Sequence, residues 1–251
     1  MQPGRHAAAP PVEMRPMPPD PCDTPAWQGS LVIGDDWAVW RGAVGDGSTH
    51  RHFAAQAVLG GGLQVVVEQP GDVLRSGRAL FVEPLQVHRL GPSADCTLVF
   101  IEPRACPAAS LPADVAQALR RAAAAVDASA LGAFWTAWLA RPGQAAPDSW
   151  EATAREAIDT LLPAGAIGVA ALAARMHLSA ERLRHVFPQR VGMGFRRFVL
   201  WRRLWRASQC LNEGETATAA AHAAGFADAA HFARTLRATF GVTASQLRPR
   251  G

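Results

Sequence analysis

Two short patterns of helix, turn and helix, separated by one long uninterrupted helix, constrain the fold of the C-terminal third of this chain. In residues 167–194, apolar residues recur at helical spacing on both sides of a tight connection. The pattern returns in residues 217–241, where Gly225 supplies the positive φ that ends one helix and Gly241 ends the next. Residues 195–211 contain neither glycine nor proline, which predicts a helix of about 25 Å. The region is therefore expected to be all-helical, with two similar units joined by a rigid helix.

The second helix of the first unit has one apolar and one polar face. Ser179 is a suitable N-cap, and Leu183 and Phe187 lie on the face that is expected to be buried. Pro188 and Gly192 are expected to close this helix. The opposite face carries four polar residues: Glu181, Arg182, Arg184 and His185.

The second unit separates its residues in the same way. Phe226 is expected to fill the core under the turn, and Phe232, Leu236 and Phe240 have the spacing of a buried helical stripe. The other side of the helix carries Ala229, Ala230, Arg234 and Arg237. Small residues allow a close approach of the backbone, and arginine can reach the bases or phosphates of a nucleic acid.

Charge is distributed unevenly along the chain, and all 25 basic residues are arginine. Residues 167–251 hold 13 arginines and four acids, a net charge of +9, whereas residues 1–166 hold 12 arginines and 17 acids, a net charge of −5. A high-GC codon bias would account for arginine over lysine, but not for the scarcity of acids in the C-terminal third. A basic domain joined to a mildly acidic one indicates that the C-terminal third binds nucleic acid.

The region from about 167 to 248 resembles the DNA-binding domain of the AraC/XylS family of transcriptional regulators. The resemblance rests on Gly225-Phe226, Phe232, Arg234, Phe240-Gly241 and Arg248, with Arg203 and Ala207 in the long helix. It implies a domain of seven helices in which two helix-turn-helix units contact adjacent major grooves, held apart by the long helix.

The resemblance also implies which residues contact DNA. Base contacts are expected from Glu181, Arg184 and His185 in the first unit and from Ala229, Ala230 and Arg234 in the second. Contacts with the DNA backbone are expected from Arg182, Arg196, Arg197, Arg202 and Arg237. Ala229 and Ala230 stand where the family usually has Ser or Gln, so direct readout by the second unit is expected to rest mainly on Arg234.

The N-terminal half lacks helical periodicity. Residues 30–104 contain five β-rich runs, LVIG, WAVWRG, LQVVVE, ALFVEP and CTLVFIEP, which predict a β-barrel or sandwich. The segments that carry His50, His52, Gln56 and His88 resemble the two motifs of a cupin. The expected fold is thus two-domain: an N-terminal all-β cupin-like barrel with flanking helices, and a C-terminal all-α domain.

The histidines have two possible roles. In metal cupins a glutamate follows the His-x-His motif, but Gln56 stands at that position, and a neutral amide is a poorer ligand for a dication. We therefore expect no metal cofactor, and we expect Trp40, His50, His52, Gln56 and His88 to line a small-molecule effector pocket. A metal ion held by His50, His52 and His88 is the alternative.

Composition suggests four segments. They are a disordered proline-rich tail (1–25), a cupin-like sensor domain (26–105), a helical connector (106–162) and an AraC-type DNA-binding domain (163–251). In the connector, apolar residues trace two helical faces: Ala116, Leu119, Ala123 and Val126 on one, and Phe134, Trp138 and Leu139 on the other. These faces are expected either to pack on the barrel or to form a homodimer interface.

The sequence therefore predicts a sequence-specific DNA-binding transcriptional regulator, activator or repressor, rather than an enzyme. Its expected partners are double-stranded DNA, a small-molecule effector, a second copy of the chain and, for an activator, RNA polymerase. No apolar stretch approaches the ~20 residues of a membrane helix, and four dispersed cysteines favour a cytoplasmic location. The main alternative is a cupin metalloenzyme fused to a DNA-targeting domain. A DNA-alkylation repair fusion is less well supported, because the cysteines lack a zinc-like cluster.

Overall fold

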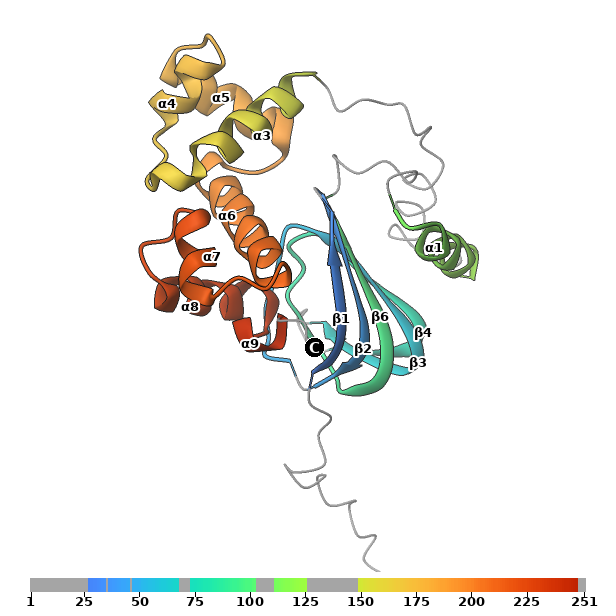
Figure 1. Cartoon of the computed structure of the whole chain (residues 1–251). Helices are drawn as coiled ribbons and strands as arrows, with labels where there is room; N and C mark the ends of the chain where they lie inside the picture. The colour runs from blue at the N-terminus through green and yellow to red at the C-terminus, as the bar shows by residue number, and fades with distance from the viewer. Residues whose placement is uncertain are drawn as a thin grey trace, which may run out of the picture.

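The computed structural model describes residues 27–34, 36–45, 47–67, 73–102, 111–125 and 149–247. An antiparallel sheet forms the N-terminal part, and helices form the C-terminal part (Figure 1). One helix, α1, covers one face of the sheet, and the C-terminal helices lie on the other side (Figure 1). The predicted tail and the connector residues Val126, Phe134, Trp138 and Leu139 lie outside the described residues, as does Arg248.

The sheet contains six strands in the order β1-β2-β6-β3-β4, with the short β5 pairing with β3. Their bounds are β1 Gln28–Ile33, β2 Trp37–Val44, β3 Ala55–Val67, β4 Val73–Val82, β5 His88–Leu90 and β6 Ser93–Ile101. All five predicted runs lie in or overlap strands. The first half of β3 and the whole of β5 were not predicted, because alanine and glycine have low β propensity and three residues are too few for a pattern.

The predicted barrel is not closed. Within the described strands, no pairing joins the edge strands β1 and β4. The long strand β3 pairs with β4 in both of its halves, with a register shift between Leu59 and Leu63. On its other edge, its first half pairs with β6 and its second half with β5. The sheet therefore curls without closing, and its inner face remains available for the C-terminal helices to cover.

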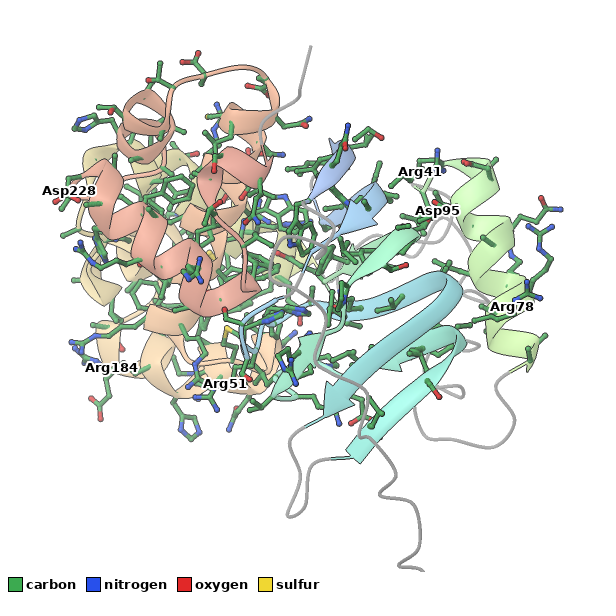
Figure 2. All side chains as sticks on the ribbon, turned by 90° about the horizontal axis from the view of Figure 1, so that it is seen from below. Arg41, Arg51, Arg78, Asp95, Arg184 and Asp228 are labelled. Atoms are coloured by element: carbon green, nitrogen blue, oxygen red, sulfur yellow. The ribbon has the colours of Figure 1, made fainter. Side chains whose placement is uncertain are left out.

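Alternation along the strands divides the apolar residues between the two faces of the sheet. Val39 on β2 and Val99 on β6 face helix α1, Ala113–Ala125, which buries Leu119 against them. Arg41 on β2, which lies beside α1 in Figure 2, also forms an ion pair with Asp114 at the start of α1. Of the two alternatives for this apolar helix face, packing on the sheet is the one observed.

The C-terminal part, residues 149–247, contains seven α-helices and one 3₁₀ turn, which confirms the predicted all-helical domain. The elements are α3 Ser149–Leu161, η2 Leu162–Ala164, α4 Val169–Arg175, α5 Ala180–Val191, α6 Phe195–Asn212, α7 Ala217–Ala223, α8 Ala229–Phe240 and α9 Ala244–Leu247. In the described part of the chain, none of the helices is long and apolar enough to cross a membrane.

Two apolar clusters share helix α6. Its first half, with Phe195 and Phe198, packs with α3, α4 and α5. Its second half, with Leu204 and Leu211, packs with α7 and α8. At 18 residues, α6 is about 27 Å long, so it sets the separation of the two helix pairs.

Candidate nucleic-acid interface and ligand pocket

Helices α4 and α5 form the first unit, as the sequence predicted. The Ser179 hydroxyl accepts a hydrogen bond from the Arg182 backbone N–H at 3.1 Å, which satisfies a free donor at the start of α5. Leu183 and Phe187 are completely buried under this helix. The four predicted polar residues, Glu181, Arg182, Arg184 and His185, are exposed on its other face.

The end of α5 differs from the prediction. Pro188 lies inside the helix, which continues to Val191 and ends at Gly192 with a φ of 76°. The proline ring has a φ compatible with a helix, so its cost is a missing backbone hydrogen bond rather than a break. The glycine, which accepts the left-handed conformation, is the residue that stops the helix.

Helices α7 and α8 form the second unit. Gly225 has a φ of 74°, and a Cβ there would overlap the carbonyl oxygen of Leu162. Glycine is therefore required both by the backbone conformation and by the close approach of a second segment. Phe226 is buried under the turn, and the Asp228 carboxylate caps α8 by accepting from the His231 backbone N–H at 2.6 Å. This hydrogen bond lowers the pKa of Asp228.

The polar face of α8 is accessible. Ala230, Arg234 and Arg237 are exposed, and Ala229 is partly exposed. Figure 2 shows Arg184 of the first unit and Asp228 at the start of α8 on the side of the molecule away from the sheet. The predicted reader faces are thus not covered by the strands or by α1, as far as the structure describes the N-terminal part.

Helix α6 carries three of the predicted DNA-backbone contacts, and the structure separates them. Arg196 and Arg197 are exposed in its first turn. Arg202 is buried, with 6% of its surface exposed, so its prediction as a DNA contact is wrong. The helical period turns this position toward the end of β6 and toward α3, where one carboxylate from each holds the guanidinium.

Arg202 belongs to a buried polar bridge that joins the two parts of the protein. Its Nη1 donates to Glu102, just after β6, at 3.1 Å, and its Nε and Nη2 donate to Asp159 of α3 at 3.0 and 2.8 Å. The Trp201 indole N–H also donates to Glu102. Sequence reasoning missed this bridge, because nothing near Glu102 indicates a partner about 100 residues away.

Burial and charge oppose each other in this bridge. Burial raises the pKa of Glu102, and the Arg202 guanidinium acts in the opposite direction. Burial alone would lower the pKa of Arg202, but Glu102 and Asp159 outweigh it and raise that pKa. The arginine therefore remains a cation, and the carboxylates depend on it for compensation.

A second set of contacts lies further along α6. The indole N–H of Trp205 donates to the Gly34 carbonyl at 2.9 Å, and the Gln209 amide donates to the same oxygen at 3.3 Å. The loop between β1 and β2 is thereby attached to α6.

An apolar pocket lies between the sheet and the C-terminal helices. Its sheet side includes Trp27, Leu31, Trp40, Leu98 and Phe100, and its helical side includes Trp205, Phe240 and Val242. The predicted pocket residues are divided. Trp40, His50 and Gln56 line this pocket, His52 lines a neighbouring one, and His88 is completely buried.

Phe240 was predicted to belong only to the core of its own unit. It is partly buried, and its ring lies 5.7 Å from the ring of His52 and 6.1 Å from that of Phe100. The α8 stripe therefore ends against the sheet, because the last turn of the helix extends beyond the core formed by Phe232 and Leu236.

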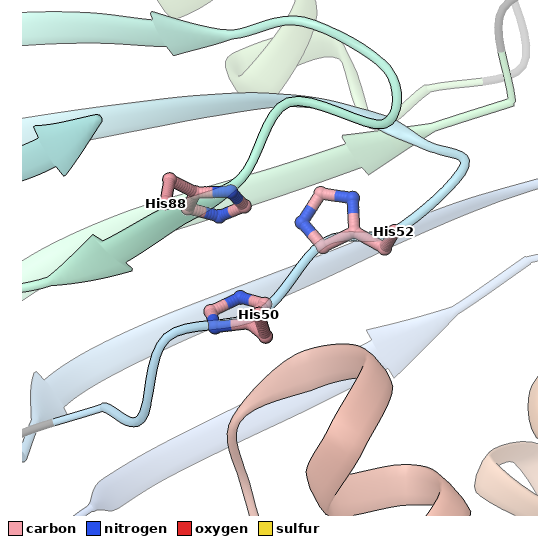
Figure 3. Close-up of side chains that lie close together, drawn as sticks. All are labelled: His50, His52 and His88. Carbon is pink, nitrogen blue, oxygen red and sulfur yellow. The ribbon is translucent and has the colours of Figure 1, made fainter. Parts of the chain in front are cut away.

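The three histidines come together as the cupin-like pattern predicted (Figure 3). The ring centroids are 4.3 Å apart for His50 and His88, 5.1 Å for His52 and His88, and 5.7 Å for His50 and His52. The Gln56 Oε1 atom is 3.1 Å from His52 Nε2 and 3.0 Å from His88 Nε2. Burial lowers the pKa of all three histidines, to about 3 for His88.

Residues 172–250 match the profile of a helix-turn-helix domain, which is a DNA-binding domain. It is a helix-turn-helix domain of the AraC type. No curated protein matches the chain.

One of the similar solved structures extends over both parts of the chain. The chain is similar to ToxT from Vibrio cholerae, with a TM-score of 0.51 and 10% identity over 85% of this chain and 98% of that one. An AraC-type transcriptional regulator from Chromobacterium violaceum has 24% identity and a TM-score of 0.35, over 40% of this chain and 94% of that one. The C-terminal domain of the response regulator yesN from Fusobacterium nucleatum has 19% identity and a TM-score of 0.37, over 41% of this chain and all of that one.

Proposed function

We propose that this protein is a sequence-specific transcriptional regulator whose DNA binding is controlled by a small apolar ligand held between the sheet and α8. The AraC-type domain supports a DNA-binding regulator. One observation supports the control mechanism most directly. Phe240 and Val242, at the end of the proposed recognition helix, line the same pocket as Trp40.

The DNA-binding part of the proposal uses two exposed helices at a defined separation. We assign base contacts to the exposed faces of α5 and α8, and backbone contacts to Arg182, Arg196, Arg197 and Arg237. Successive major-groove faces of B-DNA are about 34 Å apart. The length of α6, about 27 Å, together with the width of the flanking helices, suits that spacing.

The control part follows from the position of α8. Its first turn carries the proposed reader residues Ala229 and Ala230, and its last turn reaches the pocket. A ligand that binds better to one placement of α8 than to another shifts the protein toward that placement. Since a helix moves as a rigid element, a displacement at Phe240 also reorients the residues that face DNA.

Selection from a random DNA library with the full-length protein tests the DNA-binding part. We expect an enriched site with two short elements about 10 base pairs apart. Enrichment of a single element would contradict reading by two units. Contact with RNA polymerase and formation of a homodimer remain predictions, and the size of the selected complex measures the second.

Two neighbouring positions on β1 test the pocket. Leu31→Trp adds volume to the pocket lining, whereas Val32→Trp adds slightly more volume at a position that is 51% exposed. With the apolar fluorophore anilinonaphthalene sulfonate as probe, we expect Leu31→Trp to lose binding and Val32→Trp to retain it. We also expect only Leu31→Trp to change affinity for the selected DNA. Equal behaviour of the two variants would contradict the proposed control.

A further inference from the structure

Two tryptophans that line the apolar pocket have indole N–H groups without a hydrogen-bond partner. Trp27, just before β1, and Trp40, on β2, are 6% and 4% exposed, and their rings are in edge contact with centroids 5.4 Å apart. Within the described residues, neither Nε1 atom has an acceptor in hydrogen-bonding range. An indole N–H can only donate, and it does not titrate, so each of these groups requires an acceptor.

The unsatisfied polar groups of the protein are concentrated at this pocket. Trp205, on its helical side, differs from the other two tryptophans, because its indole N–H donates to the Gly34 carbonyl at 2.9 Å. A buried donor without a partner destabilises the folded protein, since it has given up its hydrogen bond to water. Of the four buried side-chain atoms that lack a partner among the described residues, three belong to the lining of this pocket: those of Trp27, Trp40 and Gln56.

We propose that the ligand of this pocket is an uncharged apolar compound with a carbonyl oxygen that accepts hydrogen bonds from the indoles of Trp27 and Trp40. This assignment rests on the proposed function, because it specifies the effector of the same pocket. A carbonyl oxygen has two lone pairs, so it can accept from more than one donor. The apolar part of the ligand has a matching surface, since Leu98, Phe100 and Phe240 also line the pocket.

The composition of the pocket lining favours a neutral ligand over an anionic one. None of the described residues that line the pocket is an arginine, and the chain contains no lysine. Arg51 and Arg197 line the neighbouring pocket instead. A carboxylate buried beside the two indoles would therefore lack an arginine or lysine to pair with, which is unfavourable. A neutral carbonyl oxygen loses only its hydrogen bonds to water, and the two indoles replace them.

Three compounds of nearly the same shape test the acceptor. α-Methylstyrene has a methylene group where acetophenone has its carbonyl oxygen, and benzoate has a carboxylate in place of the acetyl group. With the full-length protein in isothermal titration calorimetry, we expect acetophenone to bind about 10-fold more tightly than α-methylstyrene. Benzoate is too short to keep its carboxylate outside the pocket, as a larger anionic dye can, and should bind more weakly than acetophenone. If acetophenone binds no more tightly than either of the other two, the assignment is wrong.

The indole N–H resonances of the ¹⁵N-labelled protein show where the ketone binds. Those of Trp27 and Trp40 are identified by their disappearance in Trp27→Phe and Trp40→Phe. A hydrogen bond to an acceptor moves an indole proton signal downfield, so acetophenone should shift these signals further downfield than α-methylstyrene does. The signal of Trp205, which already donates to Gly34, is the internal control and should respond equally to both compounds. Binding of acetophenone that moves neither the Trp27 nor the Trp40 signal would overturn the proposed hydrogen bonds.

A double variant removes the two donors while keeping an aromatic ring at each position. In Trp27→Phe/Trp40→Phe, acetophenone and α-methylstyrene should bind with affinities within about 2-fold of each other, because no free indole N–H remains. Trp205→Phe, whose N–H is already bonded in the wild type, should retain the preference for the ketone. Both ligands are compared on the same variant, so a general loosening of the pocket affects them equally. A full preference for acetophenone in the double variant would overturn the role of the two indoles.

Affinity for the selected DNA, measured with and without each compound, separates this assignment from the proposed function. We expect acetophenone to change the DNA affinity at a lower concentration than α-methylstyrene does, because it fills the pocket first. A preference for the ketone with unchanged DNA affinity would contradict the proposed control and leave the ligand class standing. A change in DNA affinity without any preference for the ketone would contradict the ligand class alone.

Discussion

The substitution Arg202→Ala should destabilise the protein more than any other arginine replacement on α6. It leaves the Glu102 carboxylate, which is only 2% exposed, without its cation. At 3.1 Å and an effective dielectric constant of about 20, the lost attraction is about 5 kcal/mol. Removing one partner of a buried ion pair typically costs about 3–5 kcal/mol, because the remaining charge is uncompensated. We therefore expect the free energy of unfolding to fall by about 3–5 kcal/mol.

Urea unfolding followed by tryptophan fluorescence measures this loss, since Trp201 is hydrogen-bonded to Glu102. Arg196→Ala, in the exposed first turn of the same helix, is the matched control and should change stability by less than about 0.5 kcal/mol. If the bridge holds the two parts together, Arg202→Ala should also separate one unfolding transition into two. Equal stabilities of Arg202→Ala and Arg196→Ala would refute the reasoning.

The pH dependence gives a second check on the same variant. Burial raises the pKa of Glu102 above its usual 4.5, and loss of Arg202 removes the main opposing influence. A carboxyl group with a raised folded-state pKa imposes no penalty below pH 4.5, and the penalty grows as the pH rises through the folded pKa. The loss of unfolding free energy in Arg202→Ala, relative to the wild type, should therefore be smaller at low pH than at neutral pH. The double variant with Glu102→Gln should recover part of the loss at neutral pH, because the buried charge is gone.

Three further predictions concern DNA binding and the turn of the second unit. Arg184→Ala and Arg234→Ala should each weaken binding to the selected site by about 1–3 kcal/mol in fluorescence anisotropy, with a smaller effect on random DNA. An equal loss on both DNAs would assign them to phosphates instead. Arg196→Ala should reduce the slope of log affinity against log salt by about one, and an unchanged slope would remove it from the interface. Gly225→Ala should destabilise the protein strongly in thermal unfolding, whereas Gly194→Ala, with open space at its Cβ, should have a small effect. Similar melting temperatures for the two glycine variants would contradict the steric argument.

The parts of the fold predicted correctly depend on local chemistry. Ser179 satisfies a backbone donor of its own helix, and Gly225 adopts a φ that other residues avoid, so both positions are recognisable without a tertiary structure. The long α6 was equally predictable, because helical propensity was uninterrupted over its length.

The incorrect predictions concern residues whose contacts come from a segment far away in the sequence. Arg202 has the same side chain as Arg196 and Arg197, and only the approach of Glu102 and Asp159 makes it a buried bridge. The first half of β3 is rich in alanine and glycine, and it forms a strand because β6 and β4 pair with its two edges.

For this protein, the sequence by itself determined the two helix-turn-helix units, their connecting helix and the strand-rich N-terminal half. Capping, turn conformation and hydrophobic period act within a few residues, so they can be read along the chain. Only the tertiary structure decided that Phe240 reaches the sheet, that Glu102 pairs with Arg202, and that His52 and His88 both contact Gln56. These contacts join segments far apart in sequence, and their free energy depends on burial and on distances that no local pattern contains.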